Sequence, residues 1–291
     1  MKKPSLFIWV VLAAVVSSLA TSYVSLGNRG NSHDSTGSKA PGTYERIMQS
    51  GKVVCGYFPW PGGAEKDSNT GKVSGLVVDL VEQALATLDL KVEWQEVIMG
   101  TQVQDLNIGK IDALCNDGPW VMSAGKFVEF SDPMVATVLM PYIRIDESRF
   151  STKADLNNSS VQFVGLDGDA SVDLAQRRFP KAQLKSLPGN TDLSQLFLDV
   201  ATKKADVLIT DPHSFKAFEK TNPGKLKAFM PGKPVGTYKM VFSVAKGDMK
   251  TLGLLNQAID NAAAFGITEE VLNKHDPDHS TLKRVRSIYE D

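Results

Sequence analysis

The chain has 291 residues, of which 42% are hydrophobic and 22% charged, and its formal net charge is -1. This length and composition support a sizeable core in one long domain or two compact ones. The near-neutral charge gives no indication of nucleic acid or of another strongly charged partner.

The first 26 residues are interpreted as an export segment rather than as part of the fold. Two lysines precede the apolar run 6–20, which ends in a small-residue cleavage pattern typical of a signal peptide. Weakly apolar sequence continues to Leu26, so an uncleaved membrane anchor is the alternative. Residues 27–42 are rich in Gly, Ser and Asn and predict a flexible tether. In either case we expect the body of the chain to lie outside the cytoplasm.

The first half of the body alternates helical and strand patterns. A short helix is predicted at 44–50 and a strand at 52–57, after which prolines and glycines break the chain. Asp79 is expected to cap a helix whose apolar residues recur at helical spacing as far as Leu88. A further strand is predicted at 91–97. This alternation favours an α/β fold with mainly parallel sheets.

Two distant segments share one pattern, NIGKIDALCND at 107–117 and ATKKADVLITD at 201–211. Each predicts a helix end, a turn and a short buried strand that finishes in an aspartate. When the segments are overlaid, Asp112 meets Asp206. The repeat indicates two α/β lobes of related design. Because ligands of open parallel sheets bind beyond the carboxyl ends of the strands, the terminal aspartates are expected to line a cleft between the lobes.

The second half contains two long extended runs, at 135–145 and 237–245, which we interpret as crossover strands between the lobes. A final helix is expected at 249–265, with Gly266 as its stop. Residues 277–291 are expected to form a loose or helical tail. Between the crossovers the patterns predict a strand, two helices and a strand, at 161–164, 171–179, 193–202 (with Thr191 as cap) and 206–210.

Two crossovers imply a discontinuous first lobe, 43–140 plus 238–276, and a continuous second lobe, 141–237. Since only the crossovers would join the lobes, we expect closure to hinge near 140–142 and 237–239.

The ordered motifs resemble one known family. GKVVCGYFPWPG, GKVSGLVVDLVEQALATL, GKIDALCND and VEFSDP are similar to the first lobe of periplasmic solute-binding proteins of the polar amino-acid type, family 3. KKADVLITD and YKMVFSVAKGD fit the same family later in the chain. The resemblance implies a type II periplasmic binding protein fold, α/β with mainly parallel sheets and a cleft between two lobes. It also implies a periplasmic monomer that captures a small polar solute (amino-acid-like, amine or zwitterionic) for the permease of an ABC transporter, without a cofactor.

The resemblance also suggests which residues bind the ligand. Trp60 would stack on it, although a core residue at the edge of a lobe is an equal alternative. Asp117 to Trp120 would contact it from a loop, and Asp211 would bind its amino group. Gly168 to Ala170 open a helix whose free backbone N–H groups could hold an anion. Both Asp169 and Asp211 are also good helix caps, and that interpretation stays open. The candidate ligand-binding residues are Trp60, Asp117, Gly118, Trp120, Lys126, Gly168, Asp169, Ala170 and Asp211.

One departure from the family concerns the carboxylate clamp. Amino-acid binders carry a T-x-x-R motif before the FSDP-like motif, and its Arg forks onto the ligand carboxylate. Here Val121 and Ala124 stand at those positions. A shortened alignment offers Lys126, which is a point charge and not a planar fork. We therefore expect a ligand that presents a positive or neutral donor to Asp211, with any acidic end held near Gly168 or by Lys126.

Two other functions are compatible with the same fold, a membrane-tethered sensor domain and an enzyme similar to cyclohexadienyl dehydratase. Asp117, Asp169, Asp211 or His213 could supply a general acid or base. The sequence contains no G-x-S-x-G, HExxH or phosphate-loop motif. Residues 275–279 could hold a metal, but a tail is the preferred interpretation. A binding protein with no catalytic residue and no metal site is therefore the favoured prediction.

The two cysteines, Cys55 and Cys115, both fall in predicted core strands. We expect them on neighbouring strands and mostly buried. Export permits a disulfide between them, and the alternative is two buried thiols that act as small apolar residues.

Overall fold

The computed structural model describes residues 42–117, 125–277 and 282–285, except for the side chain of Asp117. The predicted export segment and nearly all of the predicted tether lie outside these residues, as does part of the tail. Within the described ranges, no helix is both long enough and apolar enough to cross a membrane.

The first sheet is built on a parallel core of three strands, as the alternating patterns predicted. Two further strands complete it: β12 is antiparallel to β5, and β6 is antiparallel to β12. Its strands are, in spatial order, β4 (Lys91–Glu96), β1 (Lys52–Tyr57), β5 (Ala113–Asp117), β12 (Gly236–Ala245) and β6 (Val128–Phe130).

The second sheet repeats this design. Three of its strands are parallel to one another, and β7 joins them in the antiparallel sense, with β11 on its edge. Its strands are, in spatial order, β9 (Gln183–Leu187), β8 (Gln162–Leu166), β10 (Val207–Thr210), β7 (Val135–Arg144) and β11 (Leu226–Ala228).

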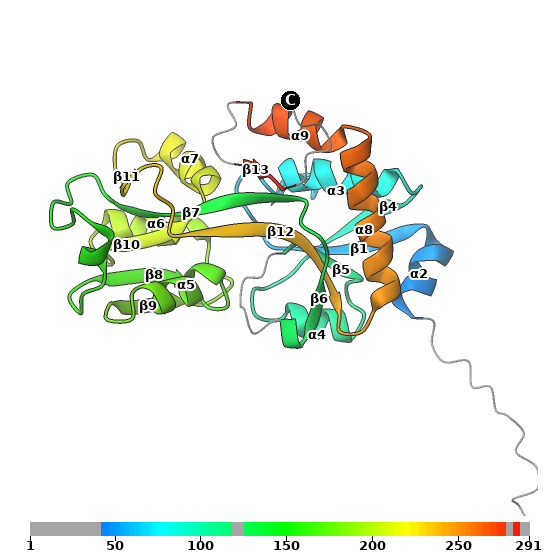
Figure 1. Cartoon of the computed structure of the whole chain (residues 1–291), viewed down its shortest axis with the longest axis horizontal. Helices are drawn as coiled ribbons and strands as arrows, with labels where there is room; N and C mark the ends of the chain where they lie inside the picture. The colour runs from blue at the N-terminus through cyan, green and yellow to red at the C-terminus, as the bar shows by residue number, and fades with distance from the viewer. Residues whose placement is uncertain (1–41, 118–124, 278–281, 286–291) are drawn as a thin grey trace, which may run out of the picture. The chain divides into compact units, whose positions relative to one another are not determined.

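The long strands β7 and β12 belong to both sheets (Figure 1). Val135–Leu139 of β7 pair with Gly236–Met240 of β12, and beyond this ribbon each strand continues into its own sheet. The extended runs in the sequence therefore form the predicted connecting strands. This pairing is compatible with lobe boundaries near 140 and 238, which stay a prediction.

Side chains alternate along the strands of the first sheet, so both of its faces carry apolar residues. Helices cover both faces and bury these residues. Ala113 and Cys115 join the core under α3 and α8, whereas Leu114 between them joins the core on the α4 side. The helices of this half are α2 (Thr43–Ser50), α3 (Leu76–Ala86), α4 (Gln102–Asn107), α8 (Met249–Ala264) and α9 (Ile267–His275).

The same alternation builds the second half. Val207 and Ile209 face the core beneath α5, and Leu208 faces the core beneath α6 and α7. Its helices are α5 (Ala170–Arg178), α6 (Leu193–Ala201), α7 (Pro212–Thr221) and the short 3-10 turn η3 (Lys153–Leu156). A small hairpin of β2 (Glu65–Lys66) and β3 (Val73–Ser74) stands apart from both sheets.

The repeated sequence pattern has a structural basis in two aspartates. Asp112 accepts a hydrogen bond from the backbone N–H of Val54 on β1, at 2.9 Å, and Asp206 accepts one from Gln162 on β8, also at 2.9 Å. Each carboxylate therefore ties the segment that leads into one strand to the neighbouring parallel strand. Each also pairs with an arginine, Asp112 with Arg46 and Asp206 with Arg149.

Two predicted helix caps are wrong. Helix α3 begins at Leu76 after Gly75, whose φ of 136° and close contact with the Gly63 carbonyl leave no room for a Cβ. Asp79 instead lies inside the first turn and pairs with Lys274 at 2.6 Å. Helix α6 is capped by Asp192 rather than by Thr191, because the Asp192 carboxylate accepts the Ser194 N–H at 2.7 Å.

The tail contains a strand that the prediction of a loose or helical segment missed. Strand β13 (Leu282–Arg284) pairs antiparallel with Val135–Thr137 of β7. Leu282 is buried in the first core, and its backbone N–H donates to the Asp276 carboxylate at 2.8 Å. One apolar side chain and one capped N–H thus fix this short strand, and neither produces a periodic signal.

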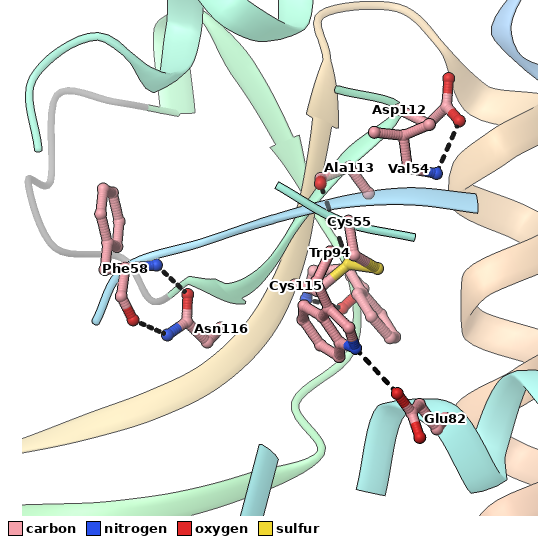
Figure 2. The surroundings of a disulfide bond; sticks show 11 residues. Val54, Cys55, Phe58, Glu82, Trp94, Asp112, Ala113, Cys115 and Asn116 are labelled. Atoms are coloured by element: carbon pink, nitrogen blue, oxygen red, sulfur yellow. Dashed lines mark hydrogen bonds between the residues drawn. A yellow bond between two sulfur atoms is a disulfide. The ribbon is translucent and has the colours of Figure 1, made fainter. Parts of the chain in front are cut away.

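Cys55 and Cys115 form a disulfide between β1 and β5, with their Cα atoms 5.5 Å apart (Figure 2). Both residues are fully buried. The prediction of neighbouring, buried positions is confirmed, and the bond resolves the alternative that the sequence left open.

Candidate functional site

A cavity of about 430 Å³ lies where residues of both sheets converge. The first sheet contributes the segment that follows β1, and the second contributes the chain beyond β8 and β10, which are the carboxyl ends of parallel strands. The connecting strands add Thr137, Leu139, Tyr238 and Met240 to the wall. Both the volume and the position are typical of a small-molecule site in α/β proteins.

The wall on the side of the first sheet is fixed by Asn116, a residue that was not predicted from the sequence. The amide of Asn116 accepts the Phe58 N–H at 2.9 Å and donates to the Phe58 carbonyl at 2.8 Å (Figure 2). The neighbouring disulfide ties the same two strands together. The segment from Phe58 to Pro61 lines the cavity, and its first residue is therefore held to the end of β5.

Trp60 reaches from this segment to helix α7. Its indole Nε1 donates to Ser214 Oγ at 2.9 Å and to Asp211 Oδ2 at 3.3 Å. Its ring lies 5.6 Å from the ring of His213, centre to centre. Gly62 approaches the same histidine so closely that a Cβ would overlap the ring. These contacts join the two halves directly beside the cavity.

Three aspartates cap the helices that begin on the side of the cavity formed by the second sheet. Asp169 accepts the Ser171 N–H at 2.7 Å, Asp192 accepts that of Ser194, and Asp211 accepts that of Ser214 at 2.8 Å. All three aspartates line the cavity. The open ends of α5, α6 and α7 are therefore occupied by carboxylates of the protein itself, as helix caps usually are.

The wall is acidic. Its charged side chains are those of Glu65, Glu96, Asp169, Asp192 and Asp211, and no Lys, Arg or His is among the described lining residues. Burial raises the pKa of Asp169 above its ordinary value, and the nearby charge of Asp211 adds to this effect.

Two groups close to the wall also titrate away from their ordinary values. Burial and the neighbouring Glu96 raise the pKa of Tyr57 to about 12. Burial lowers the pKa of His213, which favours its neutral form.

The structure brings together Trp60, Asp169, Ala170 and Asp211 from the predicted set. Gly168 adjoins the wall with a φ of 83°, and an added Cβ would contact Met99. Lys126 is exposed and is not among the lining residues.

Other predicted residues cannot be placed at the cavity. Asp117 ends β5, and its side chain lies outside the described part of the molecule. Gly118, Trp120, Val121 and Ala124 also lie outside the described residues.

Several lining residues were not predicted from the sequence. Asp192 carried a recognisable signal, since an Asp before an apolar helical pattern is a good N-cap. The others carried none, because each is an ordinary polar residue until the fold places it. They include Glu65, Glu96, Asn116, Thr137 and Tyr238.

Comparison with known proteins gives one family match. A family model described as bacterial extracellular solute-binding proteins, family 3, matches residues 61–276. The probable ABC transporter extracellular-binding protein YckB of Bacillus subtilis (strain 168) is 26% identical over 172 residues, which are 58% of this chain and 58% of that relative. A probable histidine-binding protein of Neisseria gonorrhoeae is 23% identical over 92% of this chain and 94% of its own length.

Solved structures agree with the fold. The crystal structure of the ancestral amino acid-binding protein AncCDT-1, a precursor of cyclohexadienyl dehydratase, superposes with a TM-score of 0.68 at 22% identity. The superposition covers 81% of this chain and 99% of that one. The expected two-lobe architecture is therefore confirmed.

Proposed function

Since the chain belongs to the bacterial extracellular solute-binding proteins of family 3, we propose that it captures a small polar solute in the cavity and delivers it to the permease of an ABC transporter. The solute carries a positive or neutral donor group that faces Asp211. The observation that carries this proposal is a cavity of about 430 Å³ between the two sheets, and its charged lining residues in the described part of the chain are all carboxylates.

The roles of the wall residues follow from their contacts. Asp211 keeps one oxygen on the Ser214 N–H and directs the other toward Ser214 Oγ and Trp60 Nε1. A ligand ammonium would compete with the Trp60 donor for this second oxygen. Trp60 then has two functions, as an aromatic wall and as the contact that links the halves.

The protein is exported, acts in the periplasm as a monomer, and is either released by signal cleavage or held at the membrane through residues 1–26. The relatives named as binding proteins support solute capture rather than catalysis.

A thermal-shift screen of the full chain against amino acids, amines and organic acids tests the proposal. A ligand that binds only the folded state increases the free energy of unfolding by RT ln(1 + [L]/Kd) and therefore raises the melting temperature. We expect a shift from at least one solute that carries an amino or guanidino group. A flat response across all the compounds would contradict solute capture.

A further inference from the structure

The charge on the cavity wall restricts the ligand more than family membership does. Asp169 and Asp211 form the more buried part of the acidic wall, whereas Glu65, Glu96 and Asp192 are exposed. A ligand in this cavity therefore meets negative charge at its more buried wall and also along its exposed rim. Such a one-signed cleft concentrates cations and repels anions.

Among the residues that the structure describes, no side chain is in place to neutralise a ligand carboxylate. The described lining residues include no Lys, Arg or His. Lys126 is exposed and is not among the lining residues. Residues 118–124, which read GPWVMSA, contain no Lys, Arg or His at all. His213 packs against Trp60 and is not among the lining residues. The described residues and the segment 118–124 thus supply no cationic partner here.

Backbone N–H groups at the helix N-termini do not replace the missing basic side chain. Helix N-termini attract anions when their first N–H groups are open. Here the carboxylates of Asp169, Asp192 and Asp211 already accept from their own helices, at 2.7–2.8 Å. A ligand carboxylate at α5, α6 or α7 would have to approach an aspartate that already holds the site. The Asp169 cap disfavours an anion at the backbone N–H groups near Gly168, the alternative that the sequence left open.

We propose that the cavity accepts an organic cation that carries no carboxylate, of the alkyl-diamine or guanidino-alkylamine class. This inference rests on the proposed function and specifies its ligand. An unpaired carboxylate removed from water is strongly unfavourable, and like charges nearby increase that cost. An alkyl chain finds apolar partners on the same wall, including Phe58, Leu139 and Ile209.

Matched ligand pairs that differ only in the carboxylate test this inference. Calorimetric titration of the full chain compares cadaverine with lysine and agmatine with arginine at neutral pH. We expect each decarboxylated member to bind at least about tenfold more tightly than its amino-acid partner. Glutarate, which has two carboxylates and no amine, should not bind.

A pair of variants assigns the selectivity to the acidic wall. Asp169→Asn keeps a good helix cap but removes one negative charge from the cavity. It should weaken cadaverine binding and reduce the cadaverine-to-lysine affinity ratio. Asp173→Asn is the control, because Asp173 lies on the same helix and pairs with Arg177 at 2.9 Å, outside the lining residues. Its affinity ratio should equal that of the parent.

Each other outcome overturns the inference. Lysine or arginine binding as tightly as its decarboxylated partner would refute it while leaving solute capture intact. A thermal shift from another solute, when none of the cations binds, would also refute the inference and leave solute capture intact. An unchanged ratio in Asp169→Asn would show that the acidic wall does not select the ligand.

Discussion

Asp211 shows how one side chain can serve folding and binding together. It is the N-cap of α7, with a proline at the first helical position, and it is also part of the acidic wall. The two roles use different oxygens, since Oδ1 accepts the Ser214 N–H and Oδ2 faces Trp60 and Ser214 Oγ. A substitution that preserves the cap but removes the charge can therefore separate them.

We expect Asp211→Asn to fold normally and to weaken binding of a cationic ligand by about 1–3 kcal/mol, the range for losing a charged hydrogen-bond partner. Asparagine is itself a favoured helix cap. Titration calorimetry measures the effect, with Glu219→Gln on the same helix as the control, since Glu219 does not line the cavity. Affinity equal to that of the parent would leave Asp211 as a helix cap and nothing more.

Asp169 should make binding depend on pH. Its pKa is raised in the folded protein, chiefly by burial, so it retains a proton above the ordinary value of 3.8. A bound cation favours the deprotonated carboxylate. Affinity for the cation should therefore increase as the pH rises from the ordinary Asp value through the raised one.

Calorimetric titrations with the cation at several acidic pH values measure this dependence. Asp169→Asn should make the affinity less dependent on pH. The variant is needed because protonation of His213 beside Trp60 would also disfavour a cation. An identical pH profile in the variant would assign the effect to other groups. The same raised pKa means that Asp169 contributes stability fully below its ordinary pKa and loses this contribution as the pH rises through the folded value.

At the scale of elements, the close contact between the β1–β2 segment and α7 depends on a glycine. Gly62 has a φ of 70°, and a Cβ there would overlap His213. Gly71 has a φ of 72° but no atom within 4 Å of an added Cβ. An alanine would be strained to a similar degree at either position, but only at Gly62 would its Cβ also collide with α7.

We expect Gly62→Ala to weaken ligand binding and Gly71→Ala to leave it unchanged. Both substitutions carry a similar backbone penalty, of about 1 kcal/mol, because alanine disfavours positive φ. Only the first should also push α7 away from Trp60. Calorimetry with one verified ligand, together with melting curves, tests the pair. Equal losses of affinity in both variants would exclude a role for the close contact.

The elements themselves were largely predictable. The inner strands β1, β5, β8 and β10 each have a short apolar run with a turn signal beside it, and the repeat correctly aligned Asp112 with Asp206. The edge strand β9 reads QLKSL, has no apolar run and was not predicted. Cap positions failed where a close backbone approach decided the boundary, as at Gly75. The short strand β13 depends on a single buried side chain, Leu282, which no periodicity reveals.

The site was less predictable for a physical reason. Trp60, Asp169 and Asp211 were found because each stands at a strand end or helix start with a recognisable motif. Glu65 and Glu96 become lining residues only when the β2 hairpin and the end of β4 converge. Convergence of distant segments depends on tertiary packing, so isolated polar residues give no sequence signal.

At the scale of the whole body, we expect lobe closure to occur in the connecting ribbon of β7 and β12. Among the described residues these are the strands shared by both sheets, and β13 pairs with β7 at the same ribbon. Strands of this kind bend at few positions, so we place the hinge near 140–142 and 237–239. Trp60 bonded to Asp211 and Ser214 would then hold the closed arrangement.

We therefore expect the radius of gyration from small-angle scattering to decrease when a verified ligand saturates the full chain. Trp60→Phe keeps the aromatic wall but loses the Nε1 donor to Ser214 and Asp211, so the unliganded variant should be more expanded than the parent. Trp94→Phe is the control, because the Trp94 donor bonds Glu82 at 2.9 Å, away from the cavity. If the parent has the same radius with and without ligand, binding does not close the lobes, and the ribbon acts as a rigid connector between them.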